Sequence, residues 1–298
     1  MLVSSGEERE GGRSVKVGIF LNPQKSNGLP AMLALRIALE KRGCECVLEA
    51  NTARIAGEAG GIDAESFSKY VDIAAVLGGD GTMMHAVSRF GDFEKPIAGV
   101  NVGTLGFLTT CTDAELDRFA EAVAEGRFSI SKRMLLEARV CRVGGGVETF
   151  FGLNEVTLAR GETGRLVTLK ALINGEWLNR YRADGLIVAT PTGSTAYSLS
   201  AGGPLIAPDS AVMVITPICP HSLGQRSLVV PDDVEVEISP ERADDGPLLF
   251  TVDGRDTTRI DPGDRVVVNK AARTFQLVRL EGSSFYQALR QKLGWQGL

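Results

Sequence analysis

The stretch Ile73-Ala-Ala-Val-Leu-Gly-Gly-Asp-Gly-Thr82 indicates how the first half of the chain folds. A short apolar run, typical of a buried strand, ends abruptly at Gly78, and helix-like spacing of apolar residues resumes at Met83. The pattern predicts a strand, a tight loop and then a helix. An Asp-Gly hairpin is the alternative, but residues 83–87 do not alternate apolar and polar side chains as a return strand would.

Three glycines surround one aspartate in this loop. Gly78, Gly79 and Gly81 let a ligand approach the main chain closely, and the N–H groups that begin the next helix favour an anion. Asp80 differs from them because a carboxylate repels phosphate, unless a metal ion lies between the two or the carboxylate faces a hydroxyl whose proton must leave. The loop therefore predicts an anion site with one acidic group beside it.

Strands and helices alternate on both sides of this stretch. We expect strands at Val15–Leu21, Cys44–Leu48, Ile73–Leu77 and Pro96–Val100, and helices at Leu29–Arg42, at Met83–Phe90 and from Thr112 to about Gly126. Residues 53–70 support no clear assignment. Such alternation implies a parallel sheet that binds ligands at the carboxyl ends of its strands, where Asn22 and Asp80 both lie.

A second glycine-bearing loop, Asn101–Phe107, follows the strand that ends at Val100. It should emerge on the same edge of the sheet as the first loop, so that the two loops flank one crevice. Phe107 stacks on a base or a nicotinamide in one interpretation and fills the core in the other.

The pattern changes after Ser129. Short strand-like runs are separated by Gly, Pro and Asp with few helical patterns between them, which predicts a mainly antiparallel β domain. The expected strands are Leu135–Val143, Val156–Ala159, Leu166–Ile173, Leu186–Thr190, Val212–Thr216, Val234–Ile238, Leu248–Val252, Arg265–Asn269 and Thr274–Val278. A last helix carries Phe285, Ala288, Leu289 and Leu293 on an apolar face, which we expect to pack on the first domain.

We therefore predict an α/β fold in four segments. These are a loose N-terminal segment at 1–14, an α/β domain at 15–126 with a mostly parallel Rossmann-like sheet, a β-rich, sandwich-like domain at 127–280, and a C-terminal helix and tail at 281–298. Two domains suit a chain of 298 residues. The 35 glycines make up a larger share of the chain than the usual value of about 7%, which indicates many tight loops.

The composition disfavours several classes of protein. The net charge of -5, without any block of Lys or Arg, argues against a nucleic-acid partner. The five cysteines are odd in number and form no CxxC pair, which indicates buried thiols in a reducing compartment rather than a zinc site or a disulfide framework. No stretch resembles a signal peptide or approaches the roughly 18 apolar residues of a membrane-spanning helix. We expect a cytoplasmic protein without a membrane partner.

Several common catalytic motifs are missing. The chain has two histidines, His85 and His221, which disfavours a Ser-His-Asp triad or a histidine metal site. The absence of a GxxxxGK[ST] sequence excludes a Walker-type phosphate loop, and the glycines after the buried strand do not match GxGxxG. Carboxylates, amides and hydroxyls in glycine-rich turns remain as candidates.

Such groups recur in the second half of the chain. Asn154-Glu155 begins a strand, and Asp184-Gly185 directly precedes another. The segment Thr190–Pro204 then brings six Ser or Thr hydroxyls, Tyr197 and three glycines, which suit a cradle for ribose and purine or, alternatively, a solvated loop. Asp253-Gly254 adds another acid or simply forms a hairpin turn.

These residues resemble the NAD kinase family, from about Val15 to Phe285. The resemblance rests on Gly78-Gly79-Asp80-Gly81-Thr82, on Asn154-Glu155, and on Asp184-Gly185 followed by Thr190–Tyr197. The first motif is shared with phosphofructokinases and with diacylglycerol and sphingosine kinases, whereas the long hydroxyl-rich motif is characteristic of NAD kinases. The family's build, an α/β part followed by a β-rich part, agrees with the predicted fold.

The resemblance implies transfer of a phosphoryl group from ATP or polyphosphate to the 2′-hydroxyl of the adenosine ribose of NAD, which gives NADP. Asp80 is the expected base for that hydroxyl, and Gly81 the expected holder of phosphate. Asn154 and Glu155 are expected to contact the substrate or the metal-bound phosphates, and Asp184 the nicotinamide side.

Further site residues follow from the same resemblance, and Asp253 is added because of its acidic side chain. These additional residues are Gly79 and Thr82 in the first motif, Phe107 as a pocket-lining residue, Thr195, Ala196, Tyr197, Ser198, Leu199 and Ser200 around adenine and ribose, the basic residues Arg165, Arg182 and Arg255, and Asp253. The family commonly works as homodimers or homotetramers in which neighbouring subunits complete the site.

Phosphoryl transfer needs alignment, charge neutralisation and a group that accepts the hydroxyl proton, and Asp80 suits the last need, although it could bind a metal instead. Because Glu155 and Asp184 are also acidic, we expect an absolute requirement for a divalent cation such as Mg²⁺, held mainly through the phosphates. A GGDGT kinase for lipid or sugar and a non-catalytic nucleotide-binding regulator stay open as rivals. The sequence leaves open the phosphoryl donor and the choice of NAD or NADH.

Overall fold

The computed structural model describes residues 14–22, 27–90, 94–103, 106–161, 165–241 and 248–295. The chain divides into two compact units. Unit 1 consists of Met1–Lys132 and Phe275–Leu298, and unit 2 of Arg133–Thr274. Most of the N-terminal segment that we expected to be loose lies outside the described residues.

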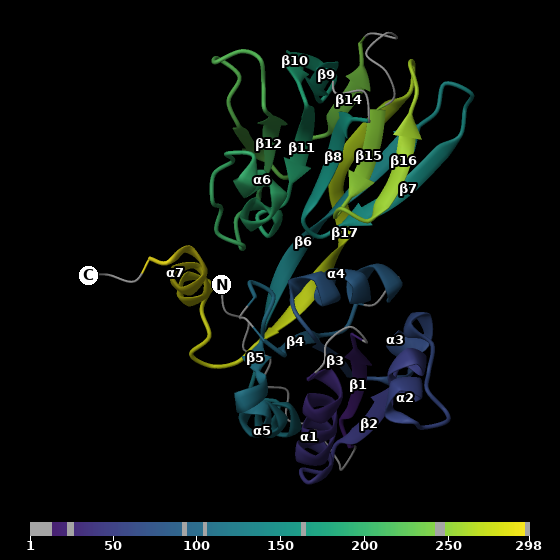
Figure 1. Ribbon diagram of the computed structural model, residues 1–298, viewed down its shortest axis with the longest axis vertical. Coiled ribbons are helices and arrows are strands. Elements are labelled where there is room, and N and C mark those ends of the chain that lie inside the picture. Colours follow the sequence, from purple (N-terminus) through teal and green to yellow (C-terminus); the bar gives the residue numbers. More distant parts are fainter. Residues whose placement is uncertain are drawn as a thin grey trace. The chain divides into compact units, whose positions relative to one another are not determined.

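Helices are concentrated in unit 1 (Figure 1). The α-helices are α1 (Gly28–Glu40), α2 (Ala50–Ala56), α3 (Phe67–Tyr70), α4 (Asp80–Arg89), α5 (Leu116–Glu125), α6 (Tyr197–Ser200) and α7 (Phe285–Leu293), and the 3₁₀ helices are η1 (Ala64–Ser66), η2 (Asp113–Glu115) and η3 (Gly193–Thr195).

Strands make up most of unit 2 and the centre of unit 1. They are β1 (Lys16–Leu21), β2 (Glu45–Leu48), β3 (Ile73–Leu77), β4 (Ile97–Asn101), β5 (Cys111–Thr112), β6 (Ser129–Cys141), β7 (Val147–Gly152), β8 (Glu155–Arg160), β9 (Val167–Ile173), β10 (Glu176–Ala183), β11 (Gly185–Ala189), β12 (Val212–Ile218), β13 (Leu228–Pro231), β14 (Val236–Pro240), β15 (Leu248–Val252), β16 (Asp256–Ile260) and β17 (Arg265–Arg279).

Unit 1 is built on a parallel sheet, as the alternation of strands and helices predicted. Its strands follow the order β4-β3-β1-β2, and every neighbouring pair in that order is parallel. All five residues of β3 are buried, which explains why its sequence is apolar without alternation. In a parallel sheet the carboxyl ends share one edge, so the loops after β1, β3 and β4 all begin there.

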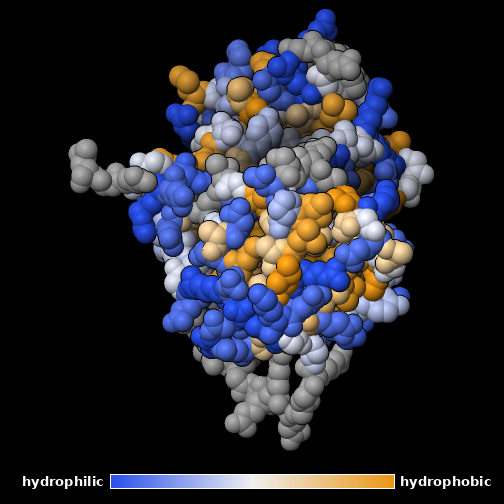
Figure 2. Space-filling view, turned by 60° about the horizontal axis from the view of Figure 1, so that its bottom comes forward, coloured by the Kyte–Doolittle hydropathy of each residue, from blue (hydrophilic) through white to orange (hydrophobic). Residues whose placement is uncertain are grey.

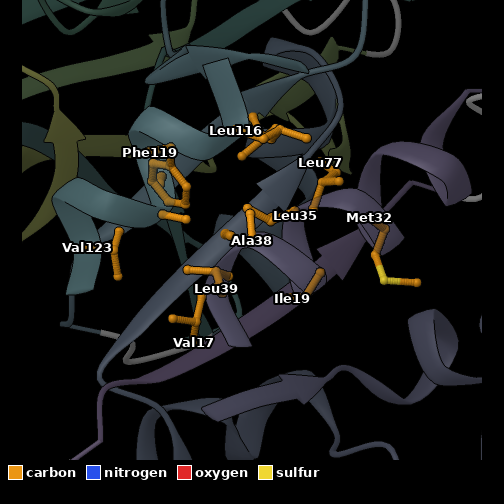
Figure 3. Packing of buried hydrophobic residues seen from close by; sticks show 14 of the residues in the cluster. Val17, Ile19, Met32, Leu35, Ala38, Leu39, Leu77, Leu116, Phe119 and Val123 are labelled. Carbon is orange, nitrogen blue, oxygen red and sulfur yellow. The ribbon is translucent and has the colours of Figure 1, made fainter. Parts of the chain in front are cut away.

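Helices cover the two faces of this sheet. On one face, Leu35 of α1 and Phe119 of α5 are fully buried and point toward the strands, together with their apolar neighbours (Figure 3). On the other face, Phe20 of β1 meets Phe90 edge-on at 5.6 Å, and Phe90 stacks with Phe67 at 5.4 Å. Apolar side chains therefore pack on both faces of the sheet.

Unit 2 is a sandwich of antiparallel strands, as predicted. One sheet has the order β13-β12-β11-β8-β15-β16, and the other includes β10-β9-β14-β17 with β6 and β7 paired beside β17 (Figure 1). Alternate side chains of both sheets, such as Leu158, Val188 and Phe250 of the first and Leu136 and Leu169 of the second, form one buried cluster.

Several predicted element boundaries were wrong. Helix α4 begins at Asp80 rather than Met83, so the loop before it is reduced to Gly78 and Gly79. Strand β17 is one strand of 15 residues where two were expected, because its partners change along its length while its extended backbone continues. The segment that we could not assign holds most of α2, together with η1 and α3. Among the described residues, five strands were missed altogether, namely β5, β7, β10, β13 and β16.

Helix α7 packs on unit 1, as predicted. The Ser284 side chain caps the helix by accepting hydrogen bonds from the N–H groups of Tyr286 and Gln287, and Gly294 ends it in the left-handed conformation. The Arg118 guanidinium of α5 donates a hydrogen bond to the Glu281 carbonyl just before the helix. The helix is thus tied to unit 1 at its N-terminal end.

The surface carries both polar and apolar side chains, and Figure 2 shows hydrophobic residues gathered among hydrophilic ones on one face. On α1, for example, Leu33 is 43% exposed, although Leu35, two residues later, is fully buried. Within the described ranges, no helix has the length and apolar character needed to cross a membrane.

Replacing Leu35 with Ala should lower the free energy of unfolding by about 2–5 kcal/mol, because the mutation removes buried methyl groups and leaves a cavity between α1 and the sheet. Leu33→Ala on the same helix is the matched control and should cost less than about 1 kcal/mol. Equilibrium urea denaturation followed by circular dichroism measures both. Equal losses for the two variants would contradict the packing described here.

Candidate functional site

The glycines of the first motif have different roles. Gly78 has a positive φ of 155°, and a Cβ atom there would lie 2.2 Å from the Thr82 hydroxyl oxygen, so the fold itself requires glycine at this position. That hydroxyl is buried and accepts a hydrogen bond from the Asn22 amide at 2.9 Å. Cβ atoms on Gly79 and Gly81 would meet no described atom within 4 Å. Glycine at these two positions therefore leaves space beside the main chain that the described residues do not fill.

Asp80 is the first residue of α4, and its carboxylate is held by the second glycine-bearing loop. The backbone N–H of Phe107 donates to Oδ2 at 2.9 Å, and that of Leu108 donates to Oδ1 at 3.0 Å. A Cβ atom on Gly106 would lie 2.0 Å from Oδ1, so only glycine lets the loop approach this closely. The two predicted loops therefore meet, although Thr104 and Leu105 lie outside the described residues.

Phe107 lies half-buried beside this carboxylate. Its ring is 6.1 Å from the ring of Phe285 on α7, and the ammonium group of Lys292 lies 5.4 Å from its centroid. The same ammonium group lies 3.9 Å from Asp80 Oδ2. The side chain of Phe107 thus contributes to packing and also borders Asp80 and Lys292.

A second carboxylate organises the candidate residues of unit 2. Asp253 accepts hydrogen bonds from the backbone N–H groups of Leu153, Asn154 and Glu155 at 2.8–3.0 Å. Asp253 and Gly254 both have positive φ, 52° and 65°, and form the tight turn between β15 and β16, so the hairpin interpretation was right. Asp253 therefore orients the Asn154-Glu155 motif through its backbone.

Glu155 is almost completely buried at the start of β8, and one of its carboxylate oxygens, Oε2, has no hydrogen-bond partner among the described residues. Burial, followed by the nearby charge of Asp253, raises the pKa of Glu155 to about 8, while a hydrogen bond from the Tyr197 backbone acts in the opposite direction. The pKa of Asp253 is also raised by burial, although its three backbone hydrogen bonds oppose the shift. The pair therefore favours the protonated form of Glu155 near neutral pH.

The hydroxyl-rich segment uses many of its hydroxyls internally. Thr190 donates to the Leu153 carbonyl at 2.6 Å, Ser194 donates to the Pro191 carbonyl at 2.7 Å, and the Ser198 hydroxyl lies 2.9 Å from that of Thr216. The three hydroxyl side chains of Thr190, Ser194 and Ser198 are fully buried. They hold the segment in shape and are not available to a ligand.

The accessible part of this segment lies beside the Asn154-Glu155 motif. A Cβ atom on Gly193 would lie 2.0 Å from the Asn154 carbonyl oxygen, so the segment packs directly on that motif. Tyr197 is 44% exposed. The remaining predicted residues of the segment are half-buried or exposed, namely Thr195, Ala196, Leu199 and Ser200.

Asp184 lies elsewhere in unit 2. It precedes β11, whose far end pairs with Glu155 through Ala189, so about 17 Å along the strand separates the two acids. Asp184 forms an ion pair with Arg160 at 2.8 Å. Arg165, Arg182 and Arg255 are exposed, and Arg182 lies two residues before Asp184 on β10.

Three basic residues near the candidate groups were missed by the sequence analysis. Arg160 pairs with Asp184, buried Arg133 donates to the Thr192 hydroxyl at 3.4 Å, and Lys292 lies beside Asp80. Of these three residues, only Lys292 could have been identified from the sequence, because it continues the apolar face of the last helix.

Comparison with known proteins follows the two-part architecture. Residues 17–128 match the model of the ATP-NAD kinase N-terminal domain, and residues 153–280 match that of the ATP-NAD kinase C-terminal domain. The chain belongs to the NAD kinase family.

Curated members of the NAD kinase family resemble most of the chain. The NAD kinase of Carboxydothermus hydrogenoformans is 39% identical over 272 residues, which cover 90% of this chain and 96% of that protein. The NAD kinase of Caldanaerobacter subterraneus subsp. tengcongensis is 41% identical over 281 residues, with coverages of 93% and 98%.

Solved structures of an NADH kinase and of an NAD kinase share the fold. Yeast NADH kinase complexed with NADH superposes with a TM-score of 0.88 at 27% identity and covers 96% of this chain and 89% of that one. An NAD kinase from Archaeoglobus fulgidus in complex with ATP has a TM-score of 0.73 at 21% identity, with coverages of 96% and 100%.

Glu155→Gln should make stability less sensitive to pH. Because folding raises the pKa of Glu155 from 4.5 to about 8, the wild type loses stability as pH rises through this range, whereas the neutral glutamine does not. The variant should gain about 2–4 kcal/mol on the wild type between pH 4.5 and 8, with no further gain above that. Urea denaturation across this pH range measures the difference. Exposed Glu176→Gln on β10 is the control, and a flat profile for Glu155→Gln would contradict the assignment.

Proposed function

We propose that this member of the NAD kinase family transfers a phosphoryl group from ATP or polyphosphate to the 2′-hydroxyl of the adenosine ribose of NAD and so forms NADP. The observation that carries the proposal is the Asp80 carboxylate, which two backbone N–H groups hold at the start of α4, beside the open space at Gly79 and Gly81. The names of the curated relatives support the same reaction.

Asp80 suits the role of general base. Each carboxylate oxygen accepts one backbone hydrogen bond, which leaves further lone pairs for a ribose hydroxyl. The side chain is 32% exposed, so a substrate can reach it. Since phosphoryl transfer depends mainly on alignment and charge neutralisation, a rigidly held acceptor for the hydroxyl proton is the main chemical group that the protein must supply. Gly81 and Thr82, which follow Asp80 in α4, would help to hold phosphate.

The adenosine of NAD would bind to unit 2. Glu155 offers a buried oxygen that no described residue hydrogen-bonds, and the adjoining Tyr197 offers an exposed ring for packing. Asn154, Thr195 and Ala196 complete the proposed contacts. The buried hydroxyls of Thr190, Ser194 and Ser198 would support this pocket from behind.

We also propose a homodimer or homotetramer. Asp184 and Arg182 lie a strand's length from Glu155, so within one copy of unit 2 they do not meet the adenosine-binding residues. A neighbouring subunit would bring its own Asp184 to the nicotinamide side of the substrate. This agrees with the homodimers or homotetramers that the family resemblance implies. The cytoplasm is the proposed location, in accord with five cysteines that form no disulfide.

A divalent cation, with Mg²⁺ as the proposed ion, would neutralise the phosphates. In the described part of the chain, no group of three or more His, Cys, Asp or Glu side chains forms a metal site. Mg²⁺ usually keeps several waters and is bound through one or two carboxylates together with substrate phosphates. Asp80 is the proposed protein carboxylate for this ion.

The purified wild-type protein should form NADP from NAD with ATP or polyphosphate, and excess EDTA should abolish the reaction until Mg²⁺ is restored. Enzymatic detection of NADP measures both effects. Parallel incubations with NADH, with lipid and sugar acceptors and with other nucleotides as donors test the alternatives. Phosphorylation of a lipid or sugar without NADP formation, or NADP formation in excess chelator, would contradict the proposal.

Asp80→Asn should lower kcat for NADP formation by about 10²-fold or more, because the amide cannot accept the hydroxyl proton. NAD binding, measured by calorimetry, should be largely kept. Asp117→Asn removes an acidic side chain that is 85% exposed on α5 and should leave kcat unchanged. Full activity of Asp80→Asn would exclude the role of general base.

A further inference from the structure

Helix α7 carries a lysine where its pattern calls for an apolar residue. Phe285, Ala288, Leu289 and Lys292 follow the i, i+3, i+4, i+7 spacing of one helix face. Ala288 and Leu289 are buried, and Phe285 packs against Phe107. Lys292 therefore points in the same direction as the face that packs on unit 1, whereas Arg290 occupies another side of the helix.

The ammonium group of Lys292 reaches Asp80. It lies 3.9 Å from Oδ2 of the carboxylate and 5.4 Å from the centroid of the Phe107 ring. The first distance is longer than a hydrogen bond, so the ammonium group neutralises charge without using its donors on the carboxylate. The Lys292 side chain is 35% exposed, which leaves the ammonium group accessible to a ligand.

The local structure holds the lysine in this position. Ser284 caps the start of α7, and the N–H of Trp295 bonds to the Arg290 carbonyl at 2.9 Å where Gly294 ends the helix. Lys292 thus belongs to the last turn, where the helix dipole favours a positive charge. Its ammonium group also lies over the Phe107 ring.

We propose that Lys292 binds the phosphoryl group that is transferred, an inference that rests on the proposed kinase activity. An acidic base next to incoming phosphate creates repulsion, and a cation beside the same carboxylate offsets it. In the reaction, the 2′-oxygen bonds to the terminal phosphorus of the donor, the bond to the bridging oxygen breaks, and the hydroxyl proton passes to Asp80. Lys292 keeps its protons throughout and donates hydrogen bonds to the phosphoryl oxygens, as a compact point charge on a flexible stem.

A purely structural ion pair is the competing explanation, and it predicts that Lys292 acts only through Asp80. The two explanations differ once Asp80 is neutral. In an Asp80→Asn background the ion pair is already lost, so any effect of Lys292 on ATP binding must arise from the phosphates.

The test uses the full-length protein and three substitutions on α7. Lys292→Met keeps the length and helix propensity of the side chain and removes the charge, Lys292→Arg keeps the charge, and Arg290→Met is the matched control. Lys292→Met should lower kcat/KM for ATP by about 10- to 10²-fold, Lys292→Arg should retain more activity, and Arg290→Met should equal the wild type. Calorimetric binding of NAD should be unchanged in all three.

Binding of ATP with Mg²⁺ to Asp80→Asn and to Asp80→Asn/Lys292→Met completes the experiment. The double variant should bind ATP about tenfold more weakly than Asp80→Asn alone. Equal ATP affinity of these two variants, or wild-type kcat/KM for Lys292→Met, would overturn the proposal for Lys292. If the wild type forms no NADP, the kinase assignment itself fails, and the ATP-binding comparison still tests the lysine.

Discussion

The carboxylate of Asp80, held by the backbone N–H groups of Phe107 and Leu108, joins the two loops on which the candidate chemistry of unit 1 depends. A parallel sheet delivers both loops to the same edge, but the sheet alone does not make them meet. Contact requires glycine at position 106, because any Cβ atom there would collide with the carboxylate. The same hydrogen bonds position the acid and order the loop.

In unit 2, too, an aspartate carboxylate accepts backbone hydrogen bonds, but here it lies between two antiparallel strands. Asp253 lies in a tight hairpin turn. Its carboxylate accepts hydrogen bonds from the N–H groups of three consecutive residues, the last of which is the first residue of β8. The hairpin explanation and the functional explanation of Asp253 are therefore compatible, since the turn places an acid that orients Asn154 and Glu155. In both units an aspartate binds backbone rather than side chains, which gives a rigid arrangement with little loss of side-chain entropy elsewhere.

Charge balance around these acids explains much of the remaining arrangement. Lys292 accompanies Asp80, Arg160 accompanies Asp184, and Glu155 has burial and a neighbouring acid that favour its protonated form. Two of these acids are thus paired with a cation, and the third is not. Each arrangement reflects local exposure, since partly exposed acids are paired with a cation and the buried acid has a raised pKa.

The sequence by itself determined the parallel sheet of unit 1, the sandwich of unit 2, the last helix and the residues of the glycine motif, because these depend on periodicity, glycine and short-range caps. Only the tertiary structure decided what each polar group faces. It showed that Thr190, Ser194 and Ser198 bind the chain itself, that Asp184 lies far along β11 from Glu155, and that Lys292 reaches Asp80 from more than 200 positions away. The physical reason is that backbone conformation follows from neighbours in sequence, whereas hydrogen bonds and ion pairs depend on neighbours in space.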